Sequence, residues 1–178
     1  MRVVSGIRRG KILKAPEGMD TRPTTDKVKA AIFNIIQFEI QDKKILDLFG
    51  GSGQLAIEAV SRGAKEALVV DNSRKAVEII KENIKNCGFE NEIGVRCADF
   101  SEVLTKAIKY DVIFLDPPYS SDLLKKALEL IVRFDILSNN GIIVCETDDL
   151  SKVDELFGEK YSVREYKYGR VRLLVIRN

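Results

Sequence analysis

From about residue 44 onward, the chain alternates between short apolar runs and longer segments whose apolar residues recur at helical spacing. Short runs rich in Val, Ile and Leu are typical of buried strands, and their regular alternation with helices is typical of a mostly parallel sheet covered on both faces. The sequence therefore predicts a doubly wound α/β fold. The expected strands span 44–49, 67–71, 93–97, 112–116 and 141–146, and the expected helices span 52–62, 74–84, 100–108, 123–131 and 149–157.

The two ends of the chain depart from this alternation. Residues 2–14 predict a short basic hairpin, and helical periodicity begins after Pro23. Residues 161–178 contain two β-like runs around Gly169 without a helical pattern between them, which predicts an antiparallel hairpin. We therefore expect one domain over 1–178, made of a basic N-terminal hairpin and helix (1–40) and a Rossmann-like core (41–178).

Composition restricts the class of protein. With 178 residues, 45% of them apolar and 31% charged, the chain has the profile of one globular domain. No apolar run approaches the roughly 18 residues of a membrane span, and the N-terminus lacks the apolar core of a signal peptide. We therefore expect a cytoplasmic protein with no membrane partner. The three cysteines are widely spaced and are expected to be reduced core residues: Cys87, Cys97 and Cys145.

Histidine is absent from the sequence. Its absence excludes Ser-His and Cys-His nucleophile systems and the usual histidine-containing zinc sites, and we expect no metal. Catalysis would then depend on carboxylates, lysines, tyrosines, backbone groups or a cofactor.

Positive charge is concentrated at both ends of the chain. Residues 1–30 hold eight Lys/Arg against three acids, and residues 160–178 hold six against one, a net of +5 at each end. Because the whole chain carries only +2, the middle carries about −8. Two basic ends favour a polyanionic partner, and solvated surface charge without a partner is the alternative.

Acidic residues stand where four of the expected strands end. The first strand runs into the glycine-rich DLFGGSG, which begins at Asp47, and the next three end at Asp71, Asp99 and Asp116. The carboxyl ends of parallel strands meet at one edge of a sheet, where α/β folds bind their ligands. We therefore expect these four carboxylates to line one binding rim.

The glycine loop allows two ligand classes. From Gly51 and Gly53 onward it matches G-x-G-x-x-A, and Asp71 follows about twenty residues later, as in dinucleotide-binding folds. The second class is S-adenosylmethionine (SAM), with the glycines near its methionine part, Asp71 on the ribose and Asp99 at the adenine edge. Asp47 favours SAM, because a carboxylate repels a pyrophosphate but suits an amino group or a sulfonium. A tight turn without a ligand is the structural alternative.

The segment VIFLDPPY, residues 112–119, uses two of the four prolines. Proline restricts its own φ and the residue before it, so we expect a rigid corner that holds the Asp116 carboxylate and the Pro117 carbonyl as acceptors. Tyr119 offers a face on which a base could stack, worth roughly 1–3 kcal/mol. Two acceptors on the N–H groups of an exocyclic amine would turn its lone pair toward the SAM methyl group, which requires no histidine. The alternative is that the motif only ends a strand.

With these motifs in place, the chain resembles the bacterial small-subunit rRNA guanine-N2 methyltransferases, the rRNA small subunit methyltransferase D family. The resemblance covers nearly the whole length. It rests on RVVSGIRRGKIL, TRPTTDKVKAAIFN, LDLFGGSGQLAIEAVSRGA, VVDNS and IFLDPPY. DPPY and the glycine loop are shared with many amino methyltransferases, whereas TRPT followed by a helix ending in FN is more specific to this family.

The resemblance implies the seven-stranded class I SAM-dependent fold, with 16S rRNA or the assembling small ribosomal subunit as partner. The sequence does not decide the oligomeric state, for which a monomer is slightly favoured. Gly50 departs from the family pattern, because many relatives carry alanine there; we expect the glycine to make the loop looser without removing a ligand contact. The implied cofactor contacts are Asp47, Gly51, Gly53, Asp71, Asp99 and Phe100. The implied catalytic residues are Asp116, Pro117 and Tyr119. The expected substrate contacts are Arg22 and Thr24, together with Arg8, Arg9 and Lys11 of the basic N-terminus.

Three other functions stay open at this point. The first is an amino methyltransferase for adenine N6 in DNA or for a protein amide; amide enzymes usually carry Asn where Asp116 stands. The second is a nicotinamide dehydrogenase, for which no obvious hydride-transfer set is present. The third is a non-catalytic RNA-binding module, which would not need Asp116.

Overall fold

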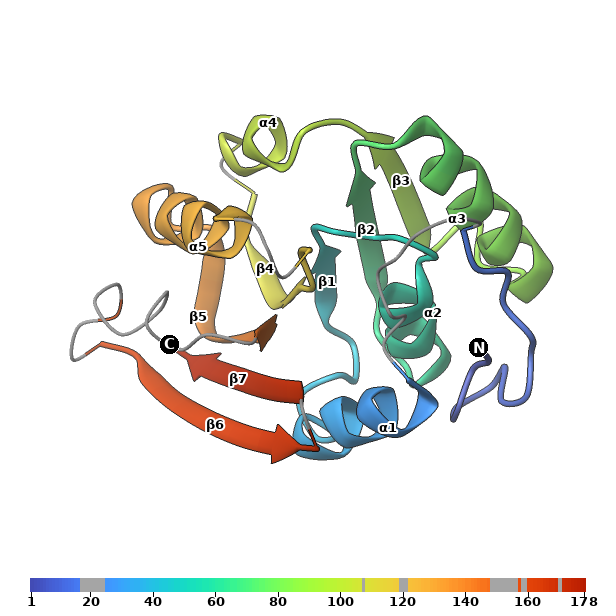
Figure 1. Ribbon diagram of the computed structural model, residues 1–178, viewed down its shortest axis with the longest axis horizontal. Helices are drawn as coiled ribbons and strands as arrows, with labels where there is room; N and C mark the ends of the chain where they lie inside the picture. Colours follow the sequence, from blue (N-terminus) through green and yellow to red (C-terminus); the bar gives the residue numbers. More distant parts are fainter. Residues whose placement is uncertain (17–24, 107, 119–121, 148–156, 158–159, 170) are drawn as a thin grey trace.

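The computed structural model describes residues 1–16, 25–106, 108–118, 122–147, 157, 160–169 and 171–178 (Figure 1). The strands in these ranges are β1 (Lys44–Asp47), β2 (Glu66–Asp71), β3 (Ile93–Cys97), β4 (Tyr110–Leu115), β5 (Leu137–Thr147), β6 (Ser162–Tyr168) and β7 (Val171–Arg177). The helices are α1 (Asp26–Ile35), α2 (Gln54–Ser61), α3 (Arg74–Cys87), α4 (Phe100–Leu104) and α5 (Leu123–Arg133). None of the helices in these ranges has the length and apolar character that a membrane span requires.

Within the described residues, seven strands form one mixed sheet in the order β3-β2-β1-β4-β5-β7-β6. The first five strands are parallel, and β7 pairs antiparallel with both β5 and β6, which confirms the predicted C-terminal hairpin. Strand β1 lies between β2 and β4, with Leu46 opposite both Leu68 and Ile113. From β1 the chain adds β2 and β3 on one side and then returns to add β4 and β5 on the other, so the strand order reverses between β1 and β4. Sheets of α/β folds bind ligands in the crevice at such a switch point.

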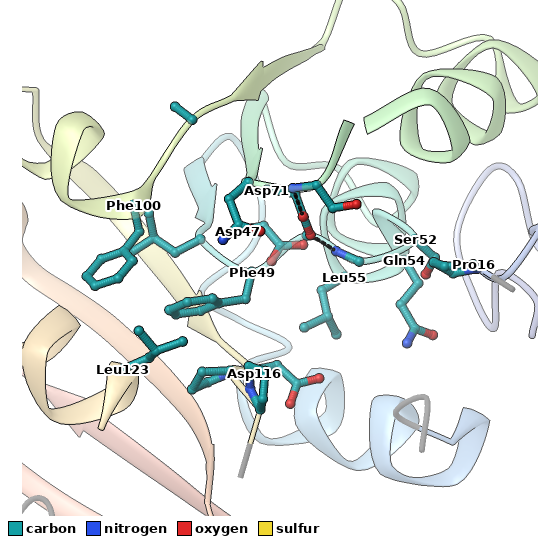
Figure 2. A pocket seen from close by; sticks show the side chains of 18 of the residues that line it. Pro16, Asp47, Phe49, Ser52, Gln54, Leu55, Asp71, Phe100, Asp116 and Leu123 are labelled. Atoms are coloured by element: carbon teal, nitrogen blue, oxygen red, sulfur yellow. Dashed lines mark hydrogen bonds between the residues drawn. The ribbon is translucent and has the colours of Figure 1, made fainter. Parts of the chain in front are cut away.

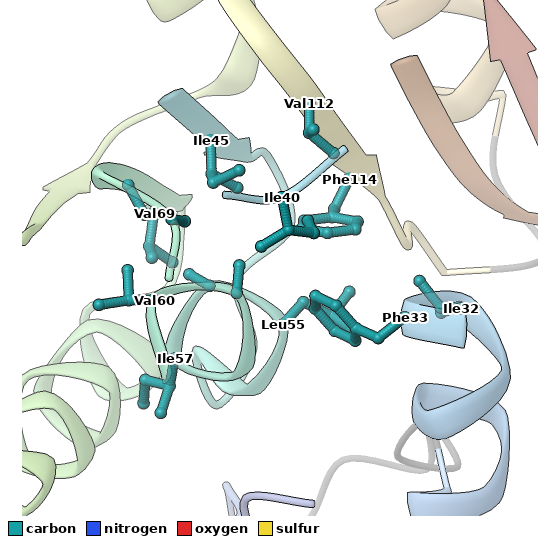
Figure 3. Packing of buried hydrophobic residues seen from close by; sticks show 14 of the residues in the cluster. Ile32, Phe33, Ile40, Ile45, Leu55, Ile57, Val60, Val69, Val112 and Phe114 are labelled. Atoms are coloured by element: carbon teal, nitrogen blue, oxygen red, sulfur yellow. The ribbon is translucent and has the colours of Figure 1, made fainter. Parts of the chain in front are cut away.

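The sheet has helices on both faces (Figure 1). Helices α1, α2 and α3 share one apolar cluster with strand residues such as Ile45 and Phe114. Helices α4 and α5 share the other with neighbours such as Leu46 and Ile113. Successive strand residues therefore point to opposite faces, as the pleat requires. Figure 3 shows the first cluster, in which the ring of Phe33 from α1 lies 5.6 Å from that of Phe114.

Local capping sets the helix boundaries. The side chain of Thr25 accepts from the Val28 N–H at the start of α1, and the side chain of Ser73 accepts from the Ala76 N–H at the start of α3. Such caps satisfy donors that the first helical turn leaves free. Helix α3 ends at Cys87 and is capped by Gly88, whose φ of 68° suits glycine.

Two elements differ in length from the prediction. Helix α4 ends at Leu104 rather than near residue 108, because the chain must enter β4, where the Tyr110 N–H donates to Ile136. Strand β5 begins at Leu137 rather than at residue 141. Residues 138–141, Ser-Asn-Asn-Gly, have the composition of a turn, and Asn140 has the left-handed φ of 60° that is common in turns. The predicted helix over 149–157 lies almost entirely outside the described residues.

Two further expectations are corrected. Cys97 is exposed at the end of β3, whereas Cys87 and Cys145 are buried, and all three are free thiols. The expected hairpin over residues 2–14 forms only a short antiparallel pairing and no strands: the Val3 N–H donates to the Lys11 carbonyl (2.9 Å), the Leu13 N–H donates to the Met1 carbonyl (3.1 Å), and one bridge links Arg2 and Ile12. The pairing does not extend further, because the N–H groups of Val4 and Ser5 donate to α2 instead.

That bonding centres on Glu58 of α2, which is fully buried. Its carboxylate accepts the N–H groups of Val4 (2.7 Å) and Ser5 (2.9 Å) and the Nε of Arg62 (2.8 Å). The Nζ of Lys29, from α1, lies 3.8 Å away and is also fully buried. Burial lowers the pKa of Lys29, and the Glu58 carboxylate opposes that shift. The network ties the N-terminal segment to α1 and α2.

Candidate active site

One pocket of about 350 Å³ opens at the carboxyl edge of the sheet. It lies at the switch point, where the loops after β1, β2, β3 and β4 converge (Figure 2). The N-terminal segment closes part of it, through Met1 and Pro16. Of the residues predicted for the site, the structure brings together Asp47, Gly51, Asp71, Asp99, Phe100, Asp116 and Pro117.

Asp71 fixes the glycine loop. Its carboxylate accepts the Gly51 N–H on one oxygen (2.9 Å) and the Ser73 N–H on the other (2.8 Å). Gly51 has a φ of 55°, a left-handed conformation that glycine adopts at no steric cost. Asp71 thus joins the loop after β1 to the end of β2, and each oxygen keeps a lone pair for a further donor.

Asp47 is the most unusual group in the pocket. It is 1% exposed, and neither carboxylate oxygen has a hydrogen-bond partner of good geometry among the described residues. Burial and the neighbouring Asp116 carboxylate raise the pKa of Asp47 to about 7, against a smaller opposing effect of nearby backbone N–H groups. A buried carboxylate without a partner is costly, so this position is suited to a cationic ligand group.

Asp116 and Pro117 follow β4 directly. Asp116 is half-buried and Pro117 is buried, and both line the pocket. Asp47 and Asp116 line the same pocket, and the negative charge of Asp116 raises the pKa of Asp47. Together they make this part of the pocket negative, which disfavours a pyrophosphate and favours positive charge.

An apolar wall faces these acids. The rings of Phe49 and Phe100 lie 5.5 Å apart with a tilt of 46°, and Leu123 of α5 also lines the pocket (Figure 2). A flat apolar group could be held against such rings. The sequence analysis did not identify Phe49 as a site residue. Its position between Asp47 and the glycine loop could have indicated that it lies at the rim.

Asp99 lies at the exposed rim and begins α4. Its carboxylate accepts the Ser101 N–H at 2.9 Å, which is the bond of a helix cap. Only one of its oxygens is used in this way, so the other can face the pocket. Its contact with adenine stays a prediction.

Several predicted residues lie elsewhere. Gly53 does not line the pocket; its N–H donates to Gly50 (2.7 Å), and it starts α2 with a φ of 75°. Arg8, Arg9 and Lys11 line a separate hollow. Three further predicted residues lie outside the described residues: Arg22, Thr24 and Tyr119.

The expectation of a looser loop at Gly50 is wrong. A Cβ built there would lie 2.3 Å from the Cγ1 of Val69 and 3.0 Å from the Cδ1 of Ile80. The loop is packed tightly against β2 and α3, and the missing side chain is what permits this close approach.

Comparison with known proteins gives a consistent family. The family described as "Conserved hypothetical protein 95" matches residues 1–177. YlbH of Bacillus subtilis, provisionally named an rRNA methyltransferase, is 42% identical over 95% of this chain and 94% of its own. Ribosomal RNA small subunit methyltransferase D of Haemophilus influenzae is 32% identical over 83% of this chain and 79% of its own.

The fold has a matching solved structure. Escherichia coli yhhF, provisionally described as a methyltransferase, superimposes with a TM-score of 0.88 at 27% identity, covering 99% of this chain and 97% of that one. This chain therefore belongs to the conserved hypothetical protein 95 family, together with the bacterial relatives named ribosomal RNA small subunit methyltransferase D.

Proposed function

We propose that this protein transfers a methyl group from SAM to the exocyclic N2 amine of a guanine in small-subunit rRNA. The names of its relatives support an rRNA methyltransferase, and the pocket supports a cationic cofactor. The observation that carries the proposal is that two carboxylates share the pocket: Asp47, which is buried and has no hydrogen-bond partner of good geometry among the described residues, and Asp116, which directly follows the neighbouring strand. Two carboxylates in one pocket suit both a charged methyl donor and an amine that becomes positive as it reacts.

The described residues fit SAM. Asp47 would pair with the ammonium group of its methionine part, which would give this buried carboxylate a positively charged partner. The free lone pairs of Asp71 would accept ribose hydroxyls, and Asp99 would accept from the adenine edge. Phe100, with Phe49, would hold the adenine ring by its apolar surface. When bound, SAM supplies a methyl group activated by a sulfonium.

The corner after β4 would act on the target base. Asp116 and the Pro117 carbonyl would accept the two N–H groups of the guanine amine and turn its lone pair out of the ring plane. The Asp116 charge would stabilise the positive nitrogen that forms, and its carboxylate could take the released proton. Tyr119 would stack on the base. Transfer would then depend on positioning and electrostatics rather than on a nucleophilic side chain.

Substrate binding would use basic residues outside this corner. Arg8, Arg9 and Lys11 would contact the RNA, and Arg22 and Thr24 would lie near the site.

Nucleoside mass spectrometry tests the proposal directly. Purified protein is incubated with methyl-deuterated SAM and small-subunit rRNA, both free and in subunits, from a strain that lacks the chain. We expect labelled N2-methylguanosine, and none with Asp116→Ala. Labelled N6-methyladenine as the only product, or no labelled nucleoside in either substrate while SAM binds, would refute the assignment.

A further inference from the structure

A second hollow, of about 480 Å³, lies between the N-terminal turn and the C-terminal end of α3. Its lining includes four cationic residues and no acidic one: Arg8, Arg9, Lys11 and Lys85. Three come from the turn and one from the last turn of α3, so residues far apart in sequence build one basic surface. Sequence reasoning identified the first three and missed Lys85.

Arg8 is a structural part of this hollow. Its Nε donates to the Cys87 carbonyl at 2.5 Å, and its guanidinium lies 5.4 Å from the centre of the Phe89 ring. The carbonyls at the end of a helix carry partial negative charge. Arg8 therefore neutralises the end of α3 that would otherwise repel an anion, and it fixes the turn against the helix.

The other three cations are free to bind a ligand. Arg9, Lys11 and Lys85 form no ion pair with another described residue, and Lys85 is exposed. The C-terminal hairpin differs, although the sequence gives it the same net charge. There Arg172 (3.3 Å) and Lys167 (3.8 Å) both pair with Glu165.

The hollow is joined to the rim of the pocket through α3. The Asn83 amide donates to the carbonyls of Lys14 and Ser52, each at 2.9 Å. Ser52 lines the pocket, and Cys87, four residues after Asn83, lines the hollow. Asn83 therefore contacts a residue of the pocket rim, and Cys87 follows it by about one helical turn, a rise of about 6 Å along α3.

We propose that Arg9, Lys11 and Lys85 bind phosphates of the RNA backbone next to the target nucleotide. The inference rests on the proposed function, since it takes the polyanion to be the RNA that enters the pocket. A hollow lined by cations and by no acidic residue, beside the helix that contacts the rim at Ser52, suits successive phosphates of one strand. These contacts would supply affinity and position, and no base specificity.

The test measures binding of a fluorescein-labelled, single-stranded RNA of mixed sequence by anisotropy over a series of salt concentrations, without SAM. Lys85→Gln is compared with Lys126→Gln, a matched exposed helical lysine on α5, on the other face of the sheet. Loss of one phosphate contact should reduce the slope of log affinity against log salt by about 0.7. We expect this reduction for Lys85→Gln and for Lys11→Gln, and an unchanged slope for Lys126→Gln. SAM affinity, measured by calorimetry, should be the same for all three.

A wild-type slope for Lys85→Gln would overturn the inference, as would equal reductions for Lys85→Gln and Lys126→Gln. Binding to vesicles of anionic phospholipid that depends on Lys85, with no binding to RNA, would also overturn it. The assay contains no methyl donor, so its result is independent of which base is methylated. A failed methylation assay with an intact Lys85 effect would reject the proposed function alone.

Discussion

Replacement of Asp47 by Asn should stabilise the protein without its cofactor and weaken its binding of SAM. The pKa of Asp47 is raised from its ordinary 3.8 to about 7, first by burial and then by the Asp116 carboxylate. Each pKa unit corresponds to about 1.4 kcal/mol, so the ionised side chain costs about 4 kcal/mol of folding stability above pH 7. A buried, unpaired amide costs about 1–3 kcal/mol, which leaves Asp47→Asn about 1–3 kcal/mol more stable.

The sign of the pH dependence follows from the raised pKa. Between pH 3.8 and about 7, folded Asp47 binds a proton more tightly than it does in the unfolded chain. Its contribution to stability is therefore full below this window and is lost as pH rises through it. The melting temperature of Asp47→Asn should be close to that of the wild type at pH 5 and roughly 2–10 °C higher at pH 8.

Calorimetric melting at both pH values, with and without SAM, checks this prediction. The wild type should gain more stability from SAM at pH 8 than Asp47→Asn does, because an ion pair to a charged group is worth about 1.5–3 kcal/mol. Asp71→Asn is the control, for which we expect the opposite change in melting temperature. The Asp71 carboxylate accepts two backbone N–H groups, so loss of its charge should destabilise the protein. A lower melting temperature for Asp47→Asn at pH 8 without SAM would show that the carboxylate is already paired and refute the reasoning.

Three further predictions concern Asp116, Gly50 and Glu58. Asp116→Ala should keep SAM affinity in calorimetry and lose most methyl transfer, with Asp116→Asn between Ala and wild type; equal turnover of all three would exclude Asp116 from the reaction. Gly50→Ala should cost about 1–3 kcal/mol in denaturant unfolding, because its Cβ would meet the Cγ1 of Val69 at 2.3 Å. Adding Val69→Ala should then cost less than it does alone, and strict additivity would contradict the clash. Glu58→Gln should lower the free energy of unfolding by about 3–5 kcal/mol, because it breaks a buried ionic network; a change below 1 kcal/mol would show that the network is not stabilising.

The sheet and the rim were predictable because both follow from local patterns. Apolar runs separated by helical periodicity fix parallel strands, and parallel strands bring their carboxyl ends together. Asp47, Asp71 and Asp116 stand directly after such runs, so their convergence needed no knowledge of distant contacts. The C-terminal hairpin was equally visible, because a glycine separates its two β-like runs.

The contacts between distant segments were not predictable. Nothing in the periodicity of α1 indicates that Lys29 is buried, or that Glu58 accepts N–H groups from residues more than fifty positions earlier. Lys85 looks like any other solvated lysine of α3 until the N-terminal turn is placed beside it. The tight fit of Gly50 depends on Val69 across the β1–β2 pair. In each case the contact depends on a segment that is distant in the sequence and adjacent in the fold, which local sequence patterns do not reveal.

The spacing of the glycines in the loop after β1 is compatible with a dinucleotide as well as with SAM. The charged groups around the loop distinguish these two ligands. The first residues of α2, Gln54 and Leu55, line the pocket, so the positive end of this helix faces the ligand. A pyrophosphate would use that end but would then lie near the two carboxylates of Asp47 and Asp116. The α-amino acid part of SAM carries both charges, so its carboxylate can meet the helix while its ammonium meets Asp47. This pairing would remove the cost of an unpartnered buried acid, whereas a pyrophosphate would increase it. We therefore expect SAM, and not NAD, to raise the melting temperature, and to raise it more at pH 8 than at pH 5.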